Sequence, residues 1–294
     1  MVEKIRLFMQ SFVENPLLFM YYFKWHCMQK RHIDRATYFK ELSITSREYF
    51  IPYILKWHTV EQNISVLEIG CGEGGNLLPF SLMGCHTVGV DMAIGRIKEA
   101  NSFFNEAGAK GTFIANDIFK EKGLEHNFDI VICHDVIEHI ADKRLFLAGL
   151  SNYLKPNGVI FMAFPAWQMP FGGHQQICRS NLLSHFPFIH LLPANLYRLV
   201  LRALGENNDC INELLSIKQT HITIEKFEDL LMSTDLCIKD RQLWLINPHY
   251  KVKFGLKPRK LHPFISAIPY LRDVFSTSCF YILKRTALRQ NSAH

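Results

Sequence analysis

The sequence predicts an α/β fold in which a mostly parallel sheet is covered by helices on both faces. From residue 64 onward, short apolar segments alternate with helical segments, and a glycine-rich turn follows the first apolar segment. Strands buried on both faces read as short, nearly continuous apolar runs, which is the pattern seen here. The expected strands are 65–69, 86–90, 111–115, 128–133, 158–164, 237–246 and 278–284.

The composition is that of an ordinary globular chain. Of its 294 residues, 48% are hydrophobic and 20% are charged. The net charge of +6 is scattered along the chain, so we expect no nucleic-acid partner. The eight cysteines form no CxxC pair and lie mostly in apolar runs, which is typical of reduced thiols. Because no signal peptide and no uncharged run of ~18 residues is found, we expect a cytoplasmic protein.

The chain is expected to divide into a helical N-terminal cap, residues 1–60, and a main domain, residues 61–294. Asn15-Pro16 resembles an N-cap followed by proline in the first helical turn. The cap also carries many aromatic side chains, which are expected to be buried against another part of the protein. The apolar residues with helical spacing are Ile5, Phe8, Met9, Phe12 and Val13.

Two connections are too long for a minimal α/β core, residues 170–222 and residues 247–276. Both follow strands of the predicted sheet, and long connections at the carboxyl edge of such a sheet commonly cover a ligand site. We therefore expect them to be lid insertions. Within the first, residues 182–204 are rich in leucine and phenylalanine. This stretch is predicted to pack on the core, with a dimer interface or a peripheral membrane contact as alternatives.

The glycine-rich turn, residues 66–75, joins a strand to a helix and predicts a nucleotide-like ligand. Gly70, Gly72 and Gly75 also satisfy the dinucleotide pattern G-x-G-x-x-G, so an NAD-dependent oxidoreductase is one alternative. Glu68 and Glu73 favour another ligand, because carboxylates repel a pyrophosphate. S-adenosylmethionine has no phosphate and offers an ammonium and a sulfonium, which carboxylates attract.

Two further acidic residues follow the next two predicted strands. Asp91 ends the second strand, where a carboxylate can accept hydrogen bonds from both ribose hydroxyls. Asp117 follows the third strand and can accept a hydrogen bond from an adenine amine while Ile118 covers the ring. The structural alternative for Asp117 is that it stabilises a turn.

These motifs together resemble the class I methyltransferases, in particular the small-molecule branch with the ubiquinone-biosynthesis O-methyltransferases. The resemblance covers residues 60–170 and returns at 222–246 and 278–285. It implies a Rossmann-like sheet of seven strands with the last one antiparallel, and S-adenosylmethionine as cofactor. The motifs that carry it are Glu68 to Gly74, Asp91, Asn116-Asp117, Phe128 to Val131, Asp135 to Ile140 and Leu154 to Gly158. The expected cofactor contacts are Glu68, Gly70, Gly72, Gly74, Asp91, Met92, Asp117, Ile118 and His134.

Methyl transfer needs mainly alignment of donor and acceptor, and a base if the acceptor is a hydroxyl. Asp135, Glu138 and His139 share one face if a helix begins after the fourth strand, and they could then hold a metal ion. We favour a structural or cofactor-orienting role for them and expect no metal. His174, which follows two glycines in an aromatic segment after the fifth strand, is our first candidate for the base. His139 is the second candidate.

The sequence thus predicts that the protein transfers the methyl group of S-adenosylmethionine to a small or lipid-like acceptor. The acceptor is expected to be apolar or aromatic and to be methylated on an oxygen atom. The acceptor segment, residues 164–175, contains aromatic side chains that can sandwich a planar or lipidic molecule. One alternative is a catalytically silent regulatory protein that binds the cofactor. The NAD-dependent oxidoreductase is the weaker alternative.

Overall fold

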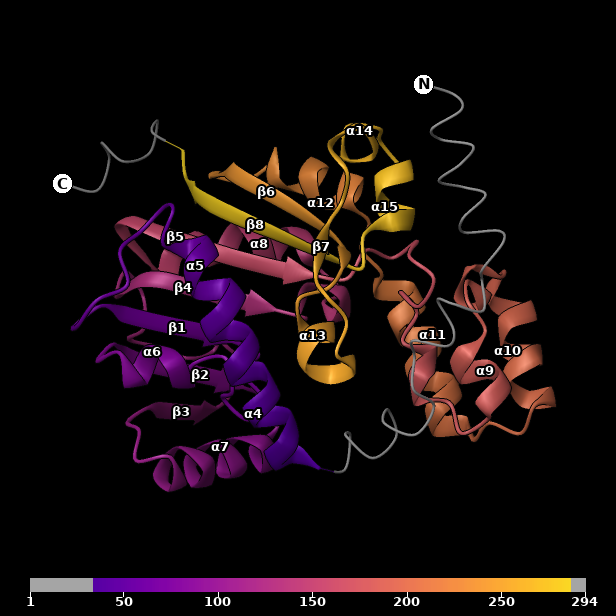
Figure 1. The fold of residues 1–294 in the computed structure, drawn as a ribbon, viewed down its shortest axis with the longest axis horizontal. Coiled ribbons are helices and arrows are strands. Elements are labelled where there is room, and N and C mark those ends of the chain that lie inside the picture. Colours follow the sequence, from indigo (N-terminus) through magenta and orange to yellow (C-terminus); the bar gives the residue numbers. More distant parts are fainter. Residues whose placement is uncertain (1–33, 287–294) are drawn as a thin grey trace.

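The computed structural model describes residues 34–286, so the helix predicted near Asn15-Pro16 lies outside the described residues. Figure 1 shows a central twisted sheet with helices on both of its faces. The strands are β1 (Ser65–Ile69), β2 (His86–Asp91), β3 (Thr112–Ala115), β4 (Phe128–His134), β5 (Leu154–Phe164), β6 (Leu236–Ile246), β7 (Arg259–Lys260) and β8 (Ser278–Arg285).

The strand order is β3-β2-β1-β4-β5-β8-β6-β7. Strands β1 to β5 pair in parallel, and β8 runs antiparallel to both β5 and β6. The predicted fold, mostly parallel with the last strand antiparallel, is therefore confirmed. The sequence missed β7, which pairs with β6 inside the 247–276 connection. Two residues are too few to show a period, so no pattern could have predicted it.

The side chains of the sheet alternate between two helical layers. In β5, Ile160 and Met162 belong to one hydrophobic cluster, whereas Phe161 and Ala163 belong to the other. The first cluster is covered by α8 (Lys143–Leu150) and α12 (Ile224–Leu231). The second is covered by α4 (Arg35–Thr45), the π-helical turn η1 (Ser46–Phe50), α5 (Ile51–Ile54), α6 (Leu78–Leu82) and α7 (Ile94–Glu106).

The described part of the predicted N-terminal cap packs directly on the sheet. The ring of Phe50 lies 4.8 Å from that of Phe161 and 5.3 Å from that of Phe280. Tyr53 contacts the same two strands, with ring distances of 6.1 and 5.8 Å. Burying two aromatic side chains is worth several kcal/mol, at about 1.5–3 kcal/mol each. These helices therefore belong to the same hydrophobic core as the sheet.

Both long connections form helical structure at the carboxyl side of the sheet. Figure 1 shows α9, α10 and α11 grouped to the right of the sheet, with α13 in front of its edge. The 170–222 connection contains the 3₁₀ turns η4 (Gln175–Ile177) and η5 (Ile189–Leu191) and the helices α9 (Asn181–His185), α10 (Ala194–Ala203) and α11 (Asn208–Thr220). The 247–276 connection contains α13 (His249–Phe254), β7, α14 (Pro263–Ser266) and α15 (Leu271–Phe275).

The described cysteines are thiols, and five of them are buried. Cys27 lies outside the described residues. Within residues 34–286, no helix has both the length and the hydropathy that crossing a bilayer requires.

A buried carboxylate, Asp273, ties the two long connections to the core. Its Oδ2 accepts a hydrogen bond from the Gln168 amide and its Oδ1 accepts one from the Ile224 amide, both at 2.8 Å. In Asp273→Ala, the backbone amides of Gln168 and Ile224 lose their hydrogen-bond acceptor. Each unsatisfied amide lowers the free energy of unfolding by about 1–3 kcal/mol. We expect urea unfolding to show a loss of about 2–5 kcal/mol. Asp229→Ala, at an exposed position of α12, is the control and should cost under about 0.5 kcal/mol.

Candidate active site

The loop that follows β1 turns on three glycines with positive φ. A Cβ at Gly70 would lie 2.4 Å from Cγ2 of Val136, and a Cβ at Gly74 would lie 2.8 Å from the Phe113 ring. Real Cβ atoms essentially never approach other atoms so closely. Gly70 and Gly74 are therefore required by packing inside the protein as well as by their backbone angles.

Gly72 differs from its neighbours because there is space for a Cβ beside it. A Cβ there would meet only the side chain of Arg96, at 3.7 Å or more. The Gly72 amide donates to Oδ2 of Asp91 at 2.9 Å, and Oδ1 of Asp91 accepts from the Ala93 amide at 2.8 Å. A carboxylate has about four acceptor positions, so Asp91 can still accept from ribose hydroxyls. Met92, beside it, is exposed to solvent.

Glu68 lies beneath the loop rather than in the pocket described below. It is 1% exposed, and its Oε1 accepts a hydrogen bond from the Asn76 amide at 2.7 Å. Burial raises the pKa of Glu68 to about 8, so it is largely protonated at neutral pH. The predicted attraction between Glu68 and the positive charges of the methyl donor stays a prediction. In the structure, Glu68 stabilises the glycine-rich loop through its hydrogen bond with Asn76.

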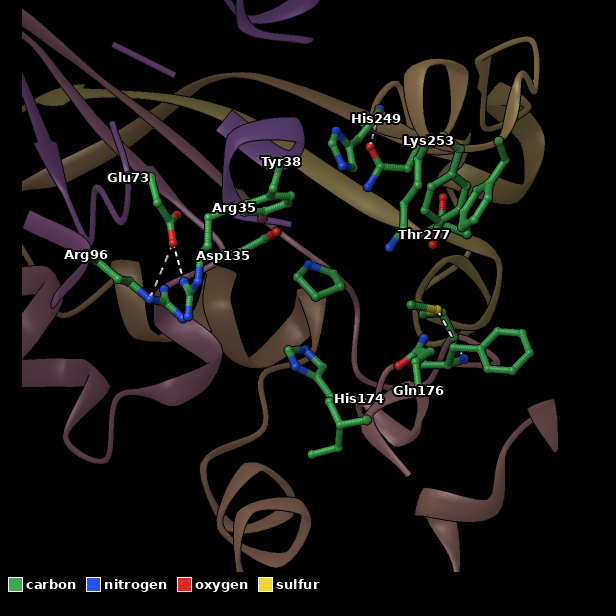
Figure 2. A pocket seen from close by; sticks show the side chains of 17 residues that line it. Arg35, Tyr38, Glu73, Arg96, Asp135, His174, Gln176, His249, Lys253 and Thr277 are labelled. Carbon is green, nitrogen blue, oxygen red and sulfur yellow. Dashed lines mark hydrogen bonds and ion pairs between the residues drawn. The ribbon is translucent and has the colours of Figure 1, made fainter. Parts of the chain in front are cut away.

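The sequence did not single out Arg35, which lies at the start of α4 and contacts the glycine-rich loop after β1. Its guanidinium forms an ion pair with Glu73, a side chain that is 1% exposed, and Arg96 approaches the same carboxylate at 3.9 Å. Figure 2 shows these three side chains together on one side of the pocket. Glu73 is thus neutralised by two arginines. A guanidinium here can also bind the carboxylate of an amino-acid ligand.

Asp117 takes part in a turn after β3. Its Oδ1 accepts from the Phe119 amide at 3.1 Å, and its Oδ2 lies 3.8 Å from Nζ of Lys120. Ile118 is buried, and its carbonyl accepts a hydrogen bond from Tyr153 at 2.9 Å. The turn-forming alternative for Asp117 is therefore present, and the adenine contact predicted for Asp117 and Ile118 stays a prediction.

The segment after β4 does not begin an α-helix, so the helical face expected for Asp135, Glu138 and His139 is wrong. Asp135 has left-handed backbone (φ 53°), and only a 3₁₀ turn, η2 (Ile137–His139), follows. Helix α8 begins later, with Asp142 as its N-cap. Asp135 lines the pocket, and its Oδ2 lies 3.6 Å from Nε2 of the largely buried His134.

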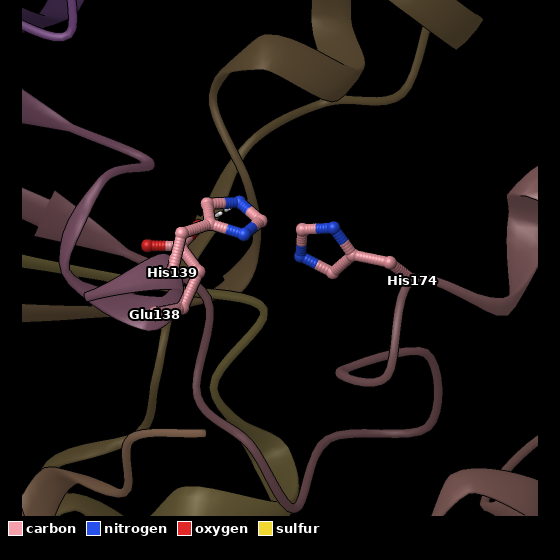
Figure 3. Close-up of side chains that lie close together, drawn as sticks. All are labelled: Glu138, His139 and His174. Atoms are coloured by element: carbon pink, nitrogen blue, oxygen red, sulfur yellow. Dashed lines mark ion pairs between the residues drawn. The ribbon is translucent and has the colours of Figure 1, made fainter. Parts of the chain in front are cut away.

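Two histidines and a glutamate converge instead, as Figure 3 shows. One ligand atom each of Glu138, His139 and His174 lies within 4.8 Å of the others, and the two imidazole centroids are 5.3 Å apart. Burial raises the pKa of Glu138 well above its usual value and lowers that of His139. Neither carboxylate oxygen of Glu138 has a hydrogen-bond partner among the described residues. These three side chains, with His174 in place of Asp135, could hold a metal ion.

His174 reaches this position through two closely packed glycines. A Cβ at Gly172 would lie 2.3 Å from the Trp167 carbonyl oxygen, and one at Gly173 would lie 2.1 Å from Cβ of His190. The backbone of His174 is itself left-handed, with φ 57°. The predicted pairing of Gly172-Gly173 with an inward His174 thus has a steric reason, because only glycine fits at both positions.

A pocket of about 300 Å³ opens at this edge of the sheet. Figure 2 shows that it lies between the ion-paired arginines, the imidazole of His174 and the side chains of α13. Charged and apolar side chains share its lining about equally, and none comes from residues 182–204. The lining residues are Arg35, Tyr38, Glu73, Arg96, Asp135, Pro165, Met169, Phe171, His174, Gln176, Ile177, Asn247, His249, Tyr250, Lys253, Phe254 and Thr277.

Known proteins share this architecture and its motifs. A ubiquinone biosynthesis O-methyltransferase of Rickettsia felis is 28% identical over 116 residues, which are 40% of this chain and 47% of that protein. One from Azorhizobium caulinodans is 34% identical over 102 residues, 35% of this chain and 40% of that protein. The chain thus spans about half the length, or less, of these curated relatives.

A solved structure and a family model extend the comparison beyond the matched core. The S-adenosylmethionine-dependent methyltransferase of Clostridium acetobutylicum superposes with a TM-score of 0.51 at 15% identity, covering 84% of this chain and 92% of that chain. This likeness shows the fold. Residues 60–230, more than half of the chain, match the family model of a methyltransferase domain. The chain therefore belongs to the class I methyltransferases, whose methyl donor is S-adenosylmethionine.

Proposed function

We propose that the protein transfers the methyl group of S-adenosylmethionine to a hydroxyl oxygen of a small or lipid-like acceptor with an apolar or aromatic body. The observation that carries this proposal is the position of the His174 imidazole, which lines the pocket and lies 5.3 Å from a second imidazole, His139. Imidazole is the usual group that removes a hydroxyl proton near neutral pH. The names of the ubiquinone-biosynthesis relatives support an oxygen acceptor.

The residues of the loop fit the donor. The open side of Gly72 leaves space for it, Asp91 retains acceptor positions for its ribose, and Arg35 can pair with its carboxylate. When bound, S-adenosylmethionine supplies a methyl carbon already activated by a sulfonium. The protein therefore has to orient the acceptor in line and exclude water from the pocket.

The far part of the pocket supports an apolar acceptor. Met169 and Phe171 come from the segment after β5, and Tyr250 and Phe254 come from α13. These side chains can hold the body of the acceptor while its hydroxyl lies near His174. The imidazole of His174 would take the hydroxyl proton as the acceptor oxygen gains the methyl group, and the donor, having lost its sulfur–methyl bond, would leave as neutral S-adenosylhomocysteine.

The decisive experiment follows labelled methyl from S-adenosylmethionine into small molecules and lipids extracted from the source cells. A labelled product whose mass rises by one methyl group, with the label lost after O-demethylation, supports the proposal. If the donor binds but no extract component is ever labelled, the protein is a silent cofactor-binding protein instead. Binding of NAD in preference to S-adenosylmethionine would contradict the proposed methyl transfer itself.

We expect turnover without a divalent metal, because the sulfonium of the donor already activates the methyl carbon and an imidazole can take the acceptor proton unaided. Chelation should leave kcat within about twofold of its untreated value. The measurement compares rates after dialysis against a chelator and after addition of Mg²⁺ or Zn²⁺. Loss of activity on chelation and recovery with metal would overturn this prediction, and would assign Glu138, His139 and His174 as ligands.

A cytoplasmic location with peripheral membrane contact is also proposed, because apolar side chains are exposed around α9 and α10. Exposed apolar groups gathered in one region favour contact with another apolar surface. The scattered charge of +6 does not favour a nucleic-acid partner. The exposed residues of this region are Leu182, Phe186, Phe188, Leu191, Leu196, Leu199 and Leu204.

A further inference from the structure

A second group of metal-ligating side chains lies in the 170–222 connection, outside the pocket. One ligand atom each of Cys178, Glu206 and Cys210 lies within 4.8 Å of the others. The three residues come from different segments: Cys178 follows η4, Glu206 lies between α10 and α11, and Cys210 is in the first turn of α11. The fold therefore brings them together, since Cys178 lies 28 residues before Glu206 and 32 residues before Cys210.

Two members of the group are buried and Cys210 is partly buried, and a further polar side chain accompanies them. Cys178 is 0% and Glu206 is 7% exposed. Tyr197 of α10 is also 0% exposed, and its hydroxyl has no hydrogen-bond partner among the described residues. Burial and the neighbouring Cys178, Cys210 and Glu206 raise the pKa of this hydroxyl. A buried phenol oxygen without a partner costs free energy unless something else at the site satisfies it.

Backbone contacts hold two of these side chains in place. The carboxylate of Glu206 accepts hydrogen bonds from the amides of Ser180, at 2.8 Å, and Arg179, at 3.1 Å. The amide of Cys210 donates to Oδ1 of Asn207, the N-cap of α11, at 2.8 Å. Burial and the neighbouring Glu206 raise the pKa of the Cys210 thiol to about 11, so it is protonated until a metal ion displaces the proton. Such supporting contacts are typical of side chains that bind metal ions.

We propose that Cys178, Cys210 and Glu206 bind one Zn²⁺ ion, with its fourth position filled by the Tyr197 oxygen or by a water that Tyr197 holds. Zinc binds thiolates at about 2.3 Å and carboxylate oxygens at about 2.0–2.2 Å, so tetrahedral ligand atoms lie about 3.5–3.8 Å apart. The observed spacing, within 4.8 Å, needs only a small contraction. On binding, each thiol gives its proton to solvent, and no oxidant or reductant is required.

A zinc ion here would join segments that share only a small hydrophobic cluster. The cluster belongs to this connection, and small helical units of this kind commonly need a metal or a disulfide to stay folded. Cys178 also follows His174 by four residues, so the ion would anchor the segment that carries the candidate base. The buried residues of the cluster are Cys178, Leu183, Ile189, Tyr197, Leu201, Ile211, Leu214 and Leu215.

The test uses the full chain, purified with reductant, stripped with a chelator and titrated with Co²⁺ as a spectroscopic substitute for Zn²⁺. We expect about one Co²⁺ per chain, a near-ultraviolet thiolate-to-cobalt band, the visible bands of a tetrahedral site and displacement by Zn²⁺. Binding should release about two protons per ion, measurable with a pH indicator. Ions bound at Glu138, His139 and His174 give no thiolate band, so the two sites are distinguished.

Variants complete the test. Cys210→Ser should abolish the thiolate-to-cobalt band or halve its intensity, and Glu206→Gln should lower zinc affinity about 10- to 100-fold or more. Cys237→Ser, at a partly exposed cysteine of β6, is the control and should leave the band unchanged. Circular dichroism verifies that each variant is folded. An unchanged band in Cys210→Ser, no cobalt uptake by the reduced protein, or a Cys178–Cys210 disulfide as the only linkage found would each overturn the proposal.

Discussion

Gly72→Val is expected to lower the affinity for S-adenosylmethionine by at least about 100-fold, equivalent to about 2.7 kcal/mol of binding free energy. A Cβ at Gly72 would meet only the side chain of Arg96, at 3.7 Å, and Arg96 lines the pocket. A branched side chain there occupies the space that the donor needs. It also strains the backbone at φ 53°, at the residue whose amide donates to Asp91. Calorimetric titration measures the affinity.

Gly108→Val is the matched control for backbone strain. Gly108 has φ 63°, a Cβ there meets nothing within 4 Å, and the residue is exposed. Both variants should lose about 1–2 kcal/mol of stability from left-handed backbone, but only Gly72→Val should lose binding. Gly74→Val, whose Cβ would collide with Phe113, should instead unfold at clearly lower temperature. Equal affinities in Gly72→Val and the native protein would place the donor elsewhere.

The sequence was sufficient for the sheet because buried parallel strands carry their own signal. In β4 and in β5 from Gly158 onward, most side chains are buried, so apolar runs mark these segments. The first four residues of β5, which the prediction missed, are mostly exposed or half-buried. The glycine-rich loop after β1 could also be predicted from the sequence. Positions 70 and 74 combine left-handed backbone with close packing, so only glycine fits there.

Contacts between distant segments could not be read in the same way. Arg35 lies 38 residues before Glu73 and carries no motif, so only the folded helix α4 reveals that it neutralises the loop carboxylate. Glu68 likewise looked like an open charge, but Asn76 and burial hold it beneath the loop. The carboxylates of the loop led to the correct methyl donor, S-adenosylmethionine. That argument did not include Arg35, whose positive charge offsets the negative charge of Glu73.

In the turn after β4, the spacing of Asp135, Glu138 and His139 along the sequence led to a wrong prediction. Residues three and four apart share a face only in an α-helix, and the left-handed backbone of Asp135 prevents one from starting there. The true neighbour of His139 is His174, 35 residues later, which two glycines bring inward. Both histidines were separate candidates in the sequence, and tertiary structure supplies the pairing between them.

His174→Asn is expected to lower kcat by about 10²- to 10⁴-fold if the imidazole removes the acceptor proton. Asparagine tolerates the left-handed backbone that His174 adopts, so the loop should keep its shape. Affinity for S-adenosylmethionine should change little, because His174 faces the acceptor side of the pocket. His86→Ala, exposed at the start of β2, serves as the control and should retain native kcat.

The pH profile and chemical rescue separate a base from a structural role. Burial lowers the pKa of His139 beneath its usual 6.5, so this second imidazole stays neutral at neutral pH and becomes protonated only as the pH falls further. In the native protein, kcat should decline at low pH as the imidazole that takes the acceptor proton becomes protonated. A decline caused by His139 alone would remain in His174→Asn. In His174→Asn, added imidazole should restore part of kcat in proportion to its unprotonated fraction. A variant with lowered kcat, an unchanged pH profile and no rescue would show that His174 only shapes the loop.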